Sequence, residues 1–408
     1  MNILVINQPI GNRGDESAHR ALMRSLVKKY PNDNIKVAFF GDKEEDVQQM
    51  NINADNVQYV VIKSHKGIIR LARFALVKSV WKALISLDPP FRKMGRLIKS
   101  ADIVITAPGG ICLGAFYNWI HLLWLVVANS YKKPMAYYSR SFGPFAVRNS
   151  VDDIFNNLSI KMLKSCDFLS IRDNKTISIA EELNLKYVSA IDTAFLERPN
   201  VSIPQEIVDS INSDRYVVFV PNSLRWHPAY INASQDKIEE FYLAIIENVI
   251  RKFADVKIVM MPQLYGAIPY RDYIYFKNLQ SKSKYSDKIV VLEDCYGSDT
   301  QQTIISKASL VIGARYHSIV FAINNARSFI SLSYEHKMFG LLSILNQEVR
   351  QINITNLGTS SFNIEKAIKD LSIIMDKEQL DCDVTCMSAH NIASDCFAQL
   401  CTNFIDQH

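Results

Sequence analysis

Short runs of β-branched and other apolar residues alternate with longer helical patterns along the chain, and this alternation narrows the possible folds more than any other feature. Alternating strands and helices are typical of parallel sheets joined by crossover helices. Runs that are apolar throughout, such as Ile103-Val-Ile-Thr, indicate strands buried on both faces of a sheet. The pattern lapses near 195–214, where Glu-Arg-Pro-Asn and Pro-Gln-Glu indicate a linker between two such series. We therefore expect an α/β fold.

The chain has 408 residues, which suffice for two domains of the usual size of about 100–200 residues. We expect an N-terminal α/β domain over 1–200, a C-terminal α/β domain over 215–380 and a C-terminal helix over 381–408. Both domains are expected to be doubly wound and Rossmann-like and to face a cleft, which is a GT-B-like architecture. In such sheets ligands collect at the carboxyl ends of the strands, so residues that directly follow strands are the candidates for a site.

The composition excludes several classes of protein. With 48% hydrophobic and 21% charged residues, the chain is neither disordered nor of low complexity. Its first residues, Met1-Asn-Ile-Leu-Val-Ile-Asn, predict a strand rather than a signal peptide. The seven scattered cysteines favour free thiols in a cytoplasmic protein, and we expect no metal site. The most apolar stretch, Ile111 to Tyr131, contains polar side chains and predicts a buried helix rather than a membrane span.

Glycine-rich and acidic segments follow two of the predicted N-terminal strands. Gly11-Asn-Arg-Gly-Asp-Glu follows the first strand and runs into a helix whose free amides could hold an anion. Helix capping is the alternative explanation for Asp15 and Glu16. Gly110, in Pro108-Gly-Gly, either lets a ligand approach the backbone or makes a structural turn. The chain lacks Gly-x-Gly-x-x-Gly, which argues against a dinucleotide site.

Two arginines also follow predicted strands of the N-terminal domain. Arg140 lies in Tyr138-Ser-Arg-Ser, an otherwise small and apolar loop, which favours an anion-binding role over that of an ordinary surface arginine. Arg172, in Ser170-Ile-Arg-Asp, could pair internally or reach into the cleft. The next residue, Asp173, is expected to cap the following helix.

The most informative segment is Leu310-Val-Ile-Gly-Ala-Arg-Tyr-His-Ser, in which Arg315 and His317 follow a buried strand at the start of a helix. Arginine offers a bidentate fork to a carboxylate or phosphate, and histidine can donate a proton near neutral pH. The alternative for His317 is a hydrogen-bonded helix cap. After the next strand, Tyr334-Glu-His-Lys repeats the arrangement and brings in a further cation, Lys337.

Charge is concentrated in one block. The chain has a formal net charge of +5, but residues 60–99 carry ten basic side chains against the single acid Asp88. That block is therefore +9, which leaves −4 for the remainder. We predict a basic amphipathic helix over 66–86, which suits an anionic membrane surface; a core helix with a solvated basic face is the alternative. Nucleic acid is not expected as a partner, because no nucleic-acid module accompanies the block.

In their order along the chain, these segments resemble the polysaccharide pyruvyl transferase family. The resemblance covers roughly residues 1–345. The residues that carry it are Gly11-Asn-Arg-Gly-Asp-Glu, Pro108-Gly-Gly, Phe142-Gly-Pro, Ser170-Ile-Arg-Asp, Asp192-Thr-Ala-Phe, Arg315-Tyr-His-Ser and Tyr334-Glu-His-Lys. It implies a GT-B-like fold and a pyruvyltransferase that moves an enolpyruvyl unit from phosphoenolpyruvate to a sugar diol. The product would be a pyruvate ketal on a surface or capsular polysaccharide precursor, with phosphoenolpyruvate as co-substrate and no other cofactor.

The resemblance implies that phosphoenolpyruvate binds Arg315 and His317, assisted by an N-domain arginine that we carry onto Arg172 and Arg140. Because phosphoenolpyruvate is a compact trianion, we add Lys337 as a further donor-binding cation. Ketal formation needs a general acid and then a base for the hydroxyls. We expect His317 to be the acid or phosphate partner, and Arg315 and Arg172 to form the anion clamp. Asp15, or else Glu16, is the expected catalytic base that accepts the hydroxyl protons. Asp15, Glu16 and Gly110 are the expected acceptor-binding residues.

Two other functions remain open at this point: a GT-B glycosyltransferase that uses a nucleotide sugar, and a non-catalytic protein that binds a glycan or an anion. If the acceptor sugar is linked to a polyprenyl diphosphate, the enzyme must work at the inner leaflet of the plasma membrane. We therefore expect a cytoplasmic protein in peripheral contact with anionic lipid through residues 66–99.

Overall fold

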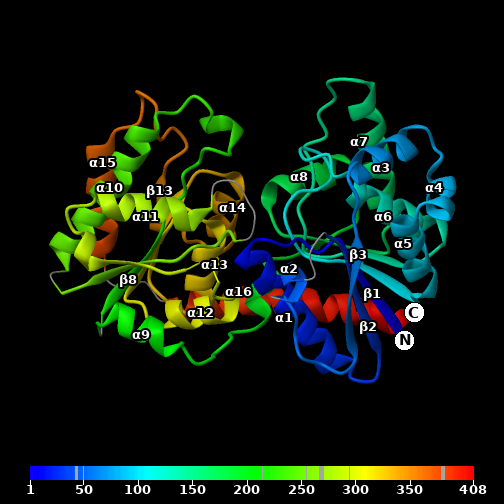
Figure 1. The fold of residues 1–408 in the computed structure, drawn as a ribbon, viewed down its shortest axis with the longest axis horizontal. Coiled ribbons are helices and arrows are strands. Elements are labelled where there is room, and N and C mark those ends of the chain that lie inside the picture. The colour runs from blue at the N-terminus through cyan, green and yellow to red at the C-terminus, as the bar shows by residue number, and fades with distance from the viewer. Residues whose placement is uncertain are drawn as a thin grey trace. The chain divides into compact units, whose positions relative to one another are not determined.

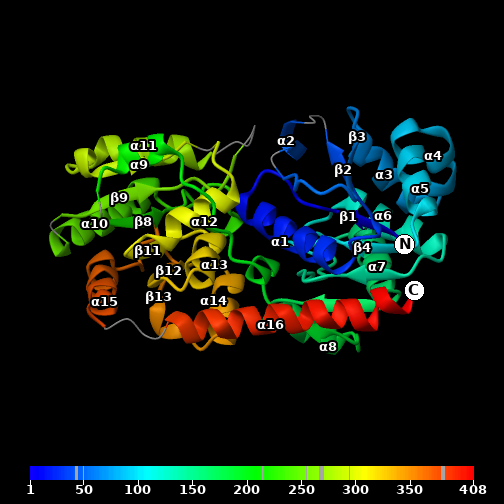
Figure 2. The same cartoon turned by 90° about the horizontal axis from the view of Figure 1, so that it is seen from below.

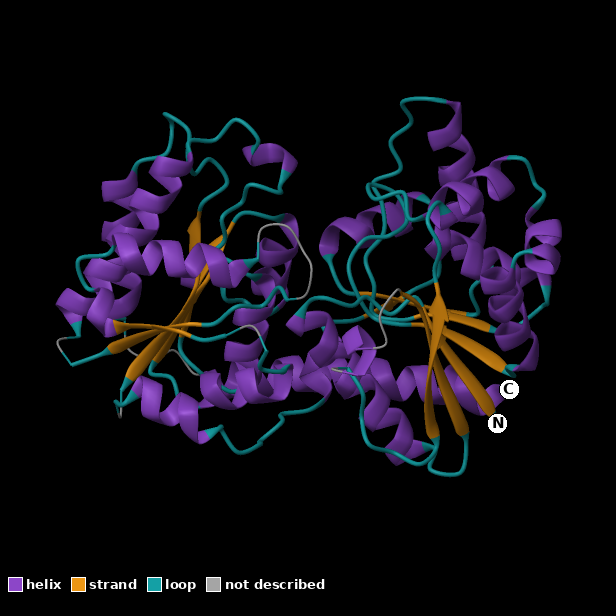
Figure 3. Ribbon diagram, viewed as in Figure 1, coloured by secondary structure: helices purple, strands orange, loops and turns teal. Residues whose placement is uncertain are grey.

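The computed structural model describes residues 1–41, 45–48, 50–213, 215–253, 255–265, 271–293, 295–377 and 382–408. They divide into two compact units (Figure 1). Unit 1 comprises Met1–Ile10, Asp15–Leu196 and Asn391–His408, and unit 2 comprises Gly11–Gly14 and Glu197–His390. Each unit is a sheet covered by helices on both faces (Figure 3).

Unit 1 contains a seven-stranded sheet in which all paired strands are parallel, in the order β3-β2-β1-β4-β5-β6-β7. The strands are β1 (Asn2–Ile6), β2 (Asn34–Gly41), β3 (Val57–Lys63), β4 (Ile103–Thr106), β5 (Met135–Tyr137), β6 (Phe168–Ile171) and β7 (Val188–Ser189). In the centre, Ile3 lies opposite Ile35 on one side and Ile103 on the other. The order reverses between β1 and β4, so post-strand loops meet there.

Alternate residues of the strands enter two separate cores of unit 1. Leu4 and Ile6 pack with α3 (Ile68–Val77), α4 (Trp81–Leu87), α5 (Pro89–Ser100), α6 (Trp119–Ser130), α7 (Ser150–Lys164) and α8 (Asn174–Glu182). Ile3 and Val5 pack on the other face with α1 (Arg13–Lys29) and with the last part of α16 (Cys382–Asn403). Figure 2 shows α1 and α16 as the two long helices at the blue and red ends of the colour scale.

Unit 2 contains a six-stranded parallel sheet in the order β10-β9-β8-β11-β12-β13. Its strands are β8 (Tyr216–Val220), β9 (Lys257–Met260), β10 (Ile289–Val291), β11 (Leu310–Gly313), β12 (Phe329–Ser333) and β13 (Gln351–Asn353). Its helices are α9 (Gln205–Ile211), α10 (Gln235–Lys252), α11 (Asp272–Lys282), α12 (Ser298–Ser306), α13 (Tyr316–Asn324), α14 (His336–Ile344) and α15 (Ile364–Asp376), together with the first part of α16. The sequence of crossovers repeats that of unit 1, which confirms the predicted doubly wound α/β class.

The basic helix predicted over 66–86 is two helices, α3 and α4, and this prediction was wrong about the residues between them. Ser79 has a φ of 56°, in the left-handed region. The amides of Ser79 and Val80 bond back to the carbonyls of Leu76 and Ala75 at 3.2 and 2.8 Å. These two bonds form a Schellman motif, which satisfies the last carbonyls of α3 and ends it. A third helix, α5, follows at once because Asp88 caps it through the amide of Phe91.

Two short segments pack away from their neighbours in sequence. Residues 11–14, expected in the N-terminal domain, belong to unit 2, and Asn391–His408, expected as a separate helix, belong to unit 1. The apolar stretch from Ile111 to Tyr131 contains α6, whose buried residues face the core as predicted. No helix in the described ranges is long and apolar enough to cross a membrane.

Candidate functional site

Arg315 and His317 lie at the carboxyl end of β11, where the chain turns into α13. The hydroxyl and the amide of Ser318 both donate to the carbonyl of Arg315, at 2.6 and 3.0 Å, and start the helix. Gly313 makes this turn possible, because a Cβ at that position would lie 1.9 Å from Ser318 Oγ. Both predicted side chains are largely buried, with 8% of Arg315 and 7% of His317 exposed. The local sequence therefore places a cation and an imidazole at one helix N-terminus.

Arg315 forms a buried ion pair with Asp272, the first residue of α11. The second carboxylate oxygen of Asp272 accepts hydrogen bonds from the amides of Gln263 and Leu264, at 3.0 and 3.1 Å. Burial alone would lower the pKa of the Arg315 guanidinium. The charge and hydrogen bond of Asp272, together with the nearby hydroxyls of Tyr334 and Tyr242, outweigh this effect, and the pKa is raised. Arg315 is therefore held charged and tied to the loop that follows β9.

His317 packs directly against the backbone of Gly14. A Cβ on Gly14 would lie 1.8 Å from Nδ1 of His317, so no larger residue fits there without moving the ring. Residues 11–14 are fastened to the loop after β9: the amide of Arg13 donates to the carbonyl of Gln263 at 2.9 Å. The Arg13 guanidinium also lies 3.8 Å from the centre of the Tyr265 ring. The motif found after the first strand thus meets the motif found after β11, within unit 2.

The start of α14 supplies the third part of this cluster. Nζ of Lys337 lies 3.2 Å from a carboxylate oxygen of Glu335 and 5.7 Å from the centre of the Tyr316 ring. Burial would raise the pKa of Glu335, but Lys337 and the hydroxyl of Tyr334 hold it below its ordinary value. The Tyr334 hydroxyl accepts a hydrogen bond from Nδ2 of Asn222, after β8, at 3.0 Å. Loops following β8, β9, β11 and β12 are therefore linked by polar contacts.

In unit 1, the guanidinium of Arg140 donates its hydrogen bonds to other groups of the protein and is not open to an anion. Nη1 donates to the carbonyls of Ala107 and Asn7, at 2.7 and 3.1 Å, and Nη2 donates to Sγ of Cys112 at 3.0 Å. The side chain is 1% exposed, and it joins the loops that follow β1, β4 and β5. It also lines a cavity of about 300 Å³ together with His121. Burial, and secondarily Arg140, lower the pKa of His121 well below its ordinary value.

Arg172 takes the first of the two roles considered for it, that of an internal ion pair. It is largely buried and pairs with Asp192, whose other oxygen accepts the amide of Ala194 at 3.0 Å. Asp173 caps α8 as expected, by accepting the amide of Thr176 at 2.9 Å. Arg172 and Asp192, both within segments that carry the family resemblance, therefore order one end of the unit 1 sheet.

The two acidic residues predicted to serve the acceptor differ in their surroundings. The helix α1 begins at Arg13, because Oδ1 of Asn12 accepts the amide of Gly14 at 2.8 Å and acts as its cap. Asp15 lies within the first turn and is half-buried, so it is not the cap. Glu16 is fully buried and pairs with Arg20 at 3.3 Å. That burial speaks against the acceptor-binding role expected of Glu16.

Gly110 offers the open backbone that an acceptor would need. A Cβ built on it meets nothing within 4 Å, whereas one on the preceding Gly109 would lie 3.0 to 3.2 Å from Pro9 and Arg140. Gly109 is therefore explained by packing inside unit 1. Gly110 is not, and its expected role in acceptor binding stays a prediction.

Two residues of the unit 2 cluster escaped the sequence analysis. Asp272 begins α11, well after β9 ends at Met260, so the rule that selects residues directly following strands does not reach it. Arg13 stands inside a segment that was singled out for its glycines and acids. Its contact with Tyr265 depends on a fold that brings residues 11–14 to unit 2, and no local pattern reveals that.

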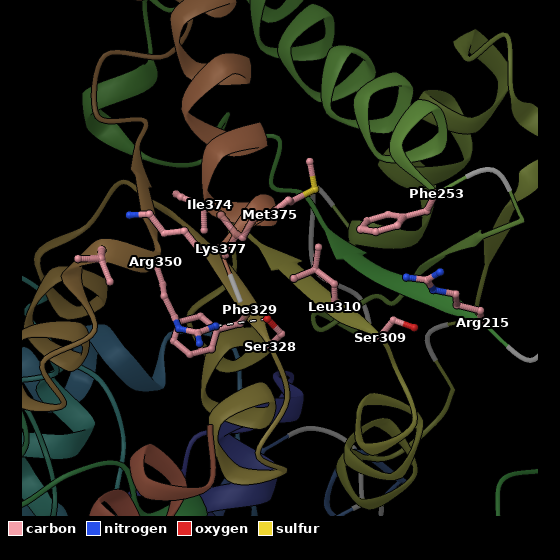
Figure 4. Close-up of a pocket in the computed structure, with 12 residues that line it drawn as sticks. Arg215, Phe253, Ser309, Leu310, Ser328, Phe329, Arg350, Ile374, Met375 and Lys377 are labelled. Atoms are coloured by element: carbon pink, nitrogen blue, oxygen red, sulfur yellow. Dashed lines mark hydrogen bonds between the residues drawn. The ribbon is translucent and has the colours of Figure 1, made fainter. Parts of the chain in front are cut away.

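A cavity of about 150 Å³ lies at the opposite end of the unit 2 sheet (Figure 4). It is lined by residues that precede or open strands, among them Arg215, Ser309 and Ser328, and by Met375 and Lys377 at the end of α15. Ligands of parallel sheets bind at the carboxyl ends of strands. We therefore place the candidate site at the Arg315 and His317 cluster and not in this cavity.

The two doubly wound sheets, each with basic residues after its strands, define an α/β protein of the GT-B type. UDP-GlcNAc 2-epimerase of Neisseria meningitidis, solved with UDP-GlcNAc, has a TM-score of 0.60 at 10% identity and covers 98% of this chain and 100% of its own. The enzyme of the same name from Methanocaldococcus jannaschii has a TM-score of 0.56 at 16% identity, covering 97% of this chain and 99% of its own. At these identities the likeness concerns the fold alone.

The chain belongs to the polysaccharide pyruvyl transferase family, whose model matches residues 12–336. A curated relative, the amylovoran biosynthesis protein AmsJ of Erwinia amylovora, is 21% identical over 364 residues, which cover 84% of this chain and 85% of that protein. The matched range includes the segments that carried the resemblance except for their two outermost residues, Gly11 and Lys337. The protein is thus a transferase that modifies polysaccharide.

Proposed function

We propose that the protein transfers the pyruvyl unit of phosphoenolpyruvate to two hydroxyls of a sugar in a surface or capsular polysaccharide precursor. Both hydroxyl oxygens bond to C2 of phosphoenolpyruvate, and the C2–O bond to phosphate breaks. One hydroxyl proton is balanced by the proton that converts the methylene into a methyl group. The other leaves with hydrogen phosphate. The products are a pyruvate ketal and phosphate, and no redox step is involved.

The observation that carries this proposal is the pairing of Arg315 and His317 at the start of α13, with Gly14 held against His317. A helix N-terminus directs amides and the positive end of its dipole toward an anion. Arg13 and Lys337 add cationic side chains to the same cluster of loops. Phosphoenolpyruvate, which carries a carboxylate and a phosphate, fits a site with several cations and amides.

In the proposed mechanism His317 gives the proton to the methylene carbon, or binds the phosphate as it leaves. Arg315 clamps the anion, and its ion pair with Asp272 fixes the direction of the guanidinium. Asp15 accepts the hydroxyl protons of the acceptor, and Gly110 admits the sugar beside the backbone. Arg140 and Arg172 act by ordering the post-strand loops of unit 1, where carbonyls and Asp192 hold them.

The test is an assay with phosphoenolpyruvate and a set of hexosides, followed by phosphate release and by mass spectrometry of the product. We expect His317→Asn to lower kcat at least about 100-fold, the usual size of a general acid–base contribution. His408→Asn, at the exposed chain terminus, should leave the rate unchanged. Near-normal turnover in His317→Asn would contradict its assignment. Turnover of nucleotide sugars, with none of phosphoenolpyruvate, would show that the proposed reaction is wrong.

A further inference from the structure

The surface formed by α3, α4 and α5 of unit 1 combines exposed apolar side chains with a dense set of cations. We infer that this surface, hereafter the basic face (residues 63–99), binds an anionic lipid bilayer. The inference concerns where the protein binds and does not depend on which donor it uses. Figures 1 and 2 both show the three helices side by side on unit 1.

Helix α3 leaves large apolar side chains outside the core. Its buried side consists of Ile68, Ala72, Ala75 and Leu76. Ile69 and Phe74 face solvent, with 61% and 55% of their surface exposed, and Leu87 at the end of α4 is 74% exposed. A solvated helix of a globular protein usually shows charged and polar residues there. These side chains are therefore available to a partner that can bury them.

The charges beside these apolar groups are almost all of one sign. Each of the ten basic residues in 60–99 is exposed. The single acid, Asp88, is already engaged, because it accepts the amide of Phe91 and pairs with His65 at 3.0 Å. Near an anionic bilayer each such cation contributes attraction, screened by salt beyond a Debye length. The basic face thus keeps its positive charge available for an anionic surface.

The order of side chains favours a bilayer over a nucleic acid. Along α3, Ile69 adjoins Arg70 and Arg73 adjoins Phe74, so apolar and cationic groups share the exposed side. Amphipathic helices that lie in a membrane interface bury such apolar groups among the acyl chains while their cations meet the headgroups. Nucleic acid could use the cations and stack on Phe74, but it offers no apolar phase to Ile69 or Leu87.

The basic face also adjoins the cavity of unit 1. Ile68 and Ile69 of α3 line that cavity, and Arg140 and His121 line it as well. A sugar carried on a lipid phosphate in the bilayer would then reach a pocket with an apolar side and a polar side. This last step rests on the proposed function, since it concerns the acceptor; the binding of the bilayer does not.

The experiment is co-sedimentation of the full chain with phosphatidylcholine vesicles, with and without phosphatidylglycerol. We expect binding only to the anionic vesicles, and weaker binding when salt rises from about 0.1 M to about 0.5 M. Arg70→Gln with Arg73→Gln should weaken it about 30-fold, whereas Arg70→Lys with Arg73→Lys should retain it. Phe74→Ser should weaken it about tenfold. The matched controls, Lys366→Gln with Lys369→Gln and Ile274→Ser, alter exposed residues of unit 2 and should bind as the wild type does.

Three outcomes would overturn the inference: binding that ignores anionic lipid, equal losses in the control variants, or preferential binding of duplex DNA that Phe74→Ser does not affect. Melting curves of each variant separate lost binding from lost fold. Turnover of a water-soluble hexoside, measured on the same Phe74→Ser protein, should be unchanged. Absence of turnover in the wild type with both water-soluble and lipid-linked sugars, together with anionic-lipid binding, would contradict the proposed function and leave the bilayer surface standing.

Discussion

Gly14 is the residue whose substitution most directly tests the candidate site, because His317 occupies the space where its Cβ would be. We expect Gly14→Ala to displace the imidazole and to lower kcat about 100-fold, since misplacement of a catalytic group by about 1 Å has an effect of that size. The overpacking should also destabilise unit 2 by about 1–3 kcal/mol. Phosphate release and urea unfolding measure the two effects.

Gly110→Ala is the matched comparison, because its added methyl group meets nothing within 4 Å. The free energy of unfolding should stay within about 0.5 kcal/mol of the wild type. If an acceptor approaches this backbone, Gly110→Ala should raise the KM for the sugar. The increase in melting temperature that phosphoenolpyruvate causes should be the same in the variant as in the wild type. An unchanged KM would remove Gly110 from the acceptor site.

His19 makes unit 1 sensitive to acid. Its ring is fully buried between Oε1 of Gln8 and the hydroxyl of Tyr59, each 3.0 Å away, and burial lowers its pKa to about 3. The unfolded chain binds a proton at this histidine below about pH 6.5, and the folded chain does not. The stabilisation is therefore complete above pH 6.5 and is lost progressively as the pH falls toward 3.

Between pH 7.5 and pH 5.5, His19 should account for about 1.4 kcal/mol of lost stability. His19→Gln, which cannot titrate, should show a correspondingly flatter dependence of the free energy of unfolding on pH. Urea unfolding at the two pH values measures the difference. Identical pH dependence in wild type and variant would contradict the prediction.

At the scale of elements, the junction between α3 and α4 can be stabilised. Ser79 occupies the left-handed position of a Schellman motif, where glycine carries no steric penalty. Ser79→Gly should therefore raise the stability of unit 1 by about 0.5–1 kcal/mol. Ser79→Ala keeps the penalty and should give no gain. Guanidinium unfolding of the two variants measures these changes. A loss of stability in Ser79→Gly would show that the left-handed conformation of residue 79 does not cost stability in the wild type.

Most strands and long helices could be predicted because their apolar patterns are continuous, as in β4 and β11. The helix boundaries that were predicted wrongly or not at all share a physical cause, because a few local contacts decide where each of these helices begins or ends. The helix α5 was not predicted, although Pro89 and Pro90 suit the first turn of a helix that Asp88 caps. The helix α9 fell inside the expected linker, where Ile207 and Ile211 now pack inward.

The candidate site was predictable to the extent that its residues directly follow strands. Arg315, His317 and Lys337 met that criterion, and in unit 2 they lie on linked loops. The partners that define their chemistry come from far along the chain: Asp272 is 43 residues from Arg315, and Gly14 lies in the first turn of α1. Such contacts depend on the register of the whole sheet, which local sequence does not reveal.

At the scale of the whole molecule, the last residues of the chain are structural. Phe404 is fully buried in one core of unit 1, four residues from the chain end, together with Leu400 and Ile405. Phe404→Ala should therefore cost about 3–5 kcal/mol. Hydrogen exchange should speed up in β1 and α1 and not in the strands of unit 2. Gln407→Ala, which alters an exposed side chain, is the control.

The return of Asn391–His408 to unit 1 has a consequence for synthesis of the chain on the ribosome. Leu196 closes the first long segment of unit 1, but Leu400 and Phe404 are made more than 200 residues later. At a synthesis rate of about 5–20 residues per second, Leu400 and Phe404 are made roughly 10–40 s after Leu196. Until then, the apolar face formed by Val5, Leu22 and Val37 lacks the side chains that complete its core. During that interval the nascent chain presents an open hydrophobic surface, a natural substrate for chaperones. A fragment ending at Leu196 is accordingly not a unit that can complete its own core.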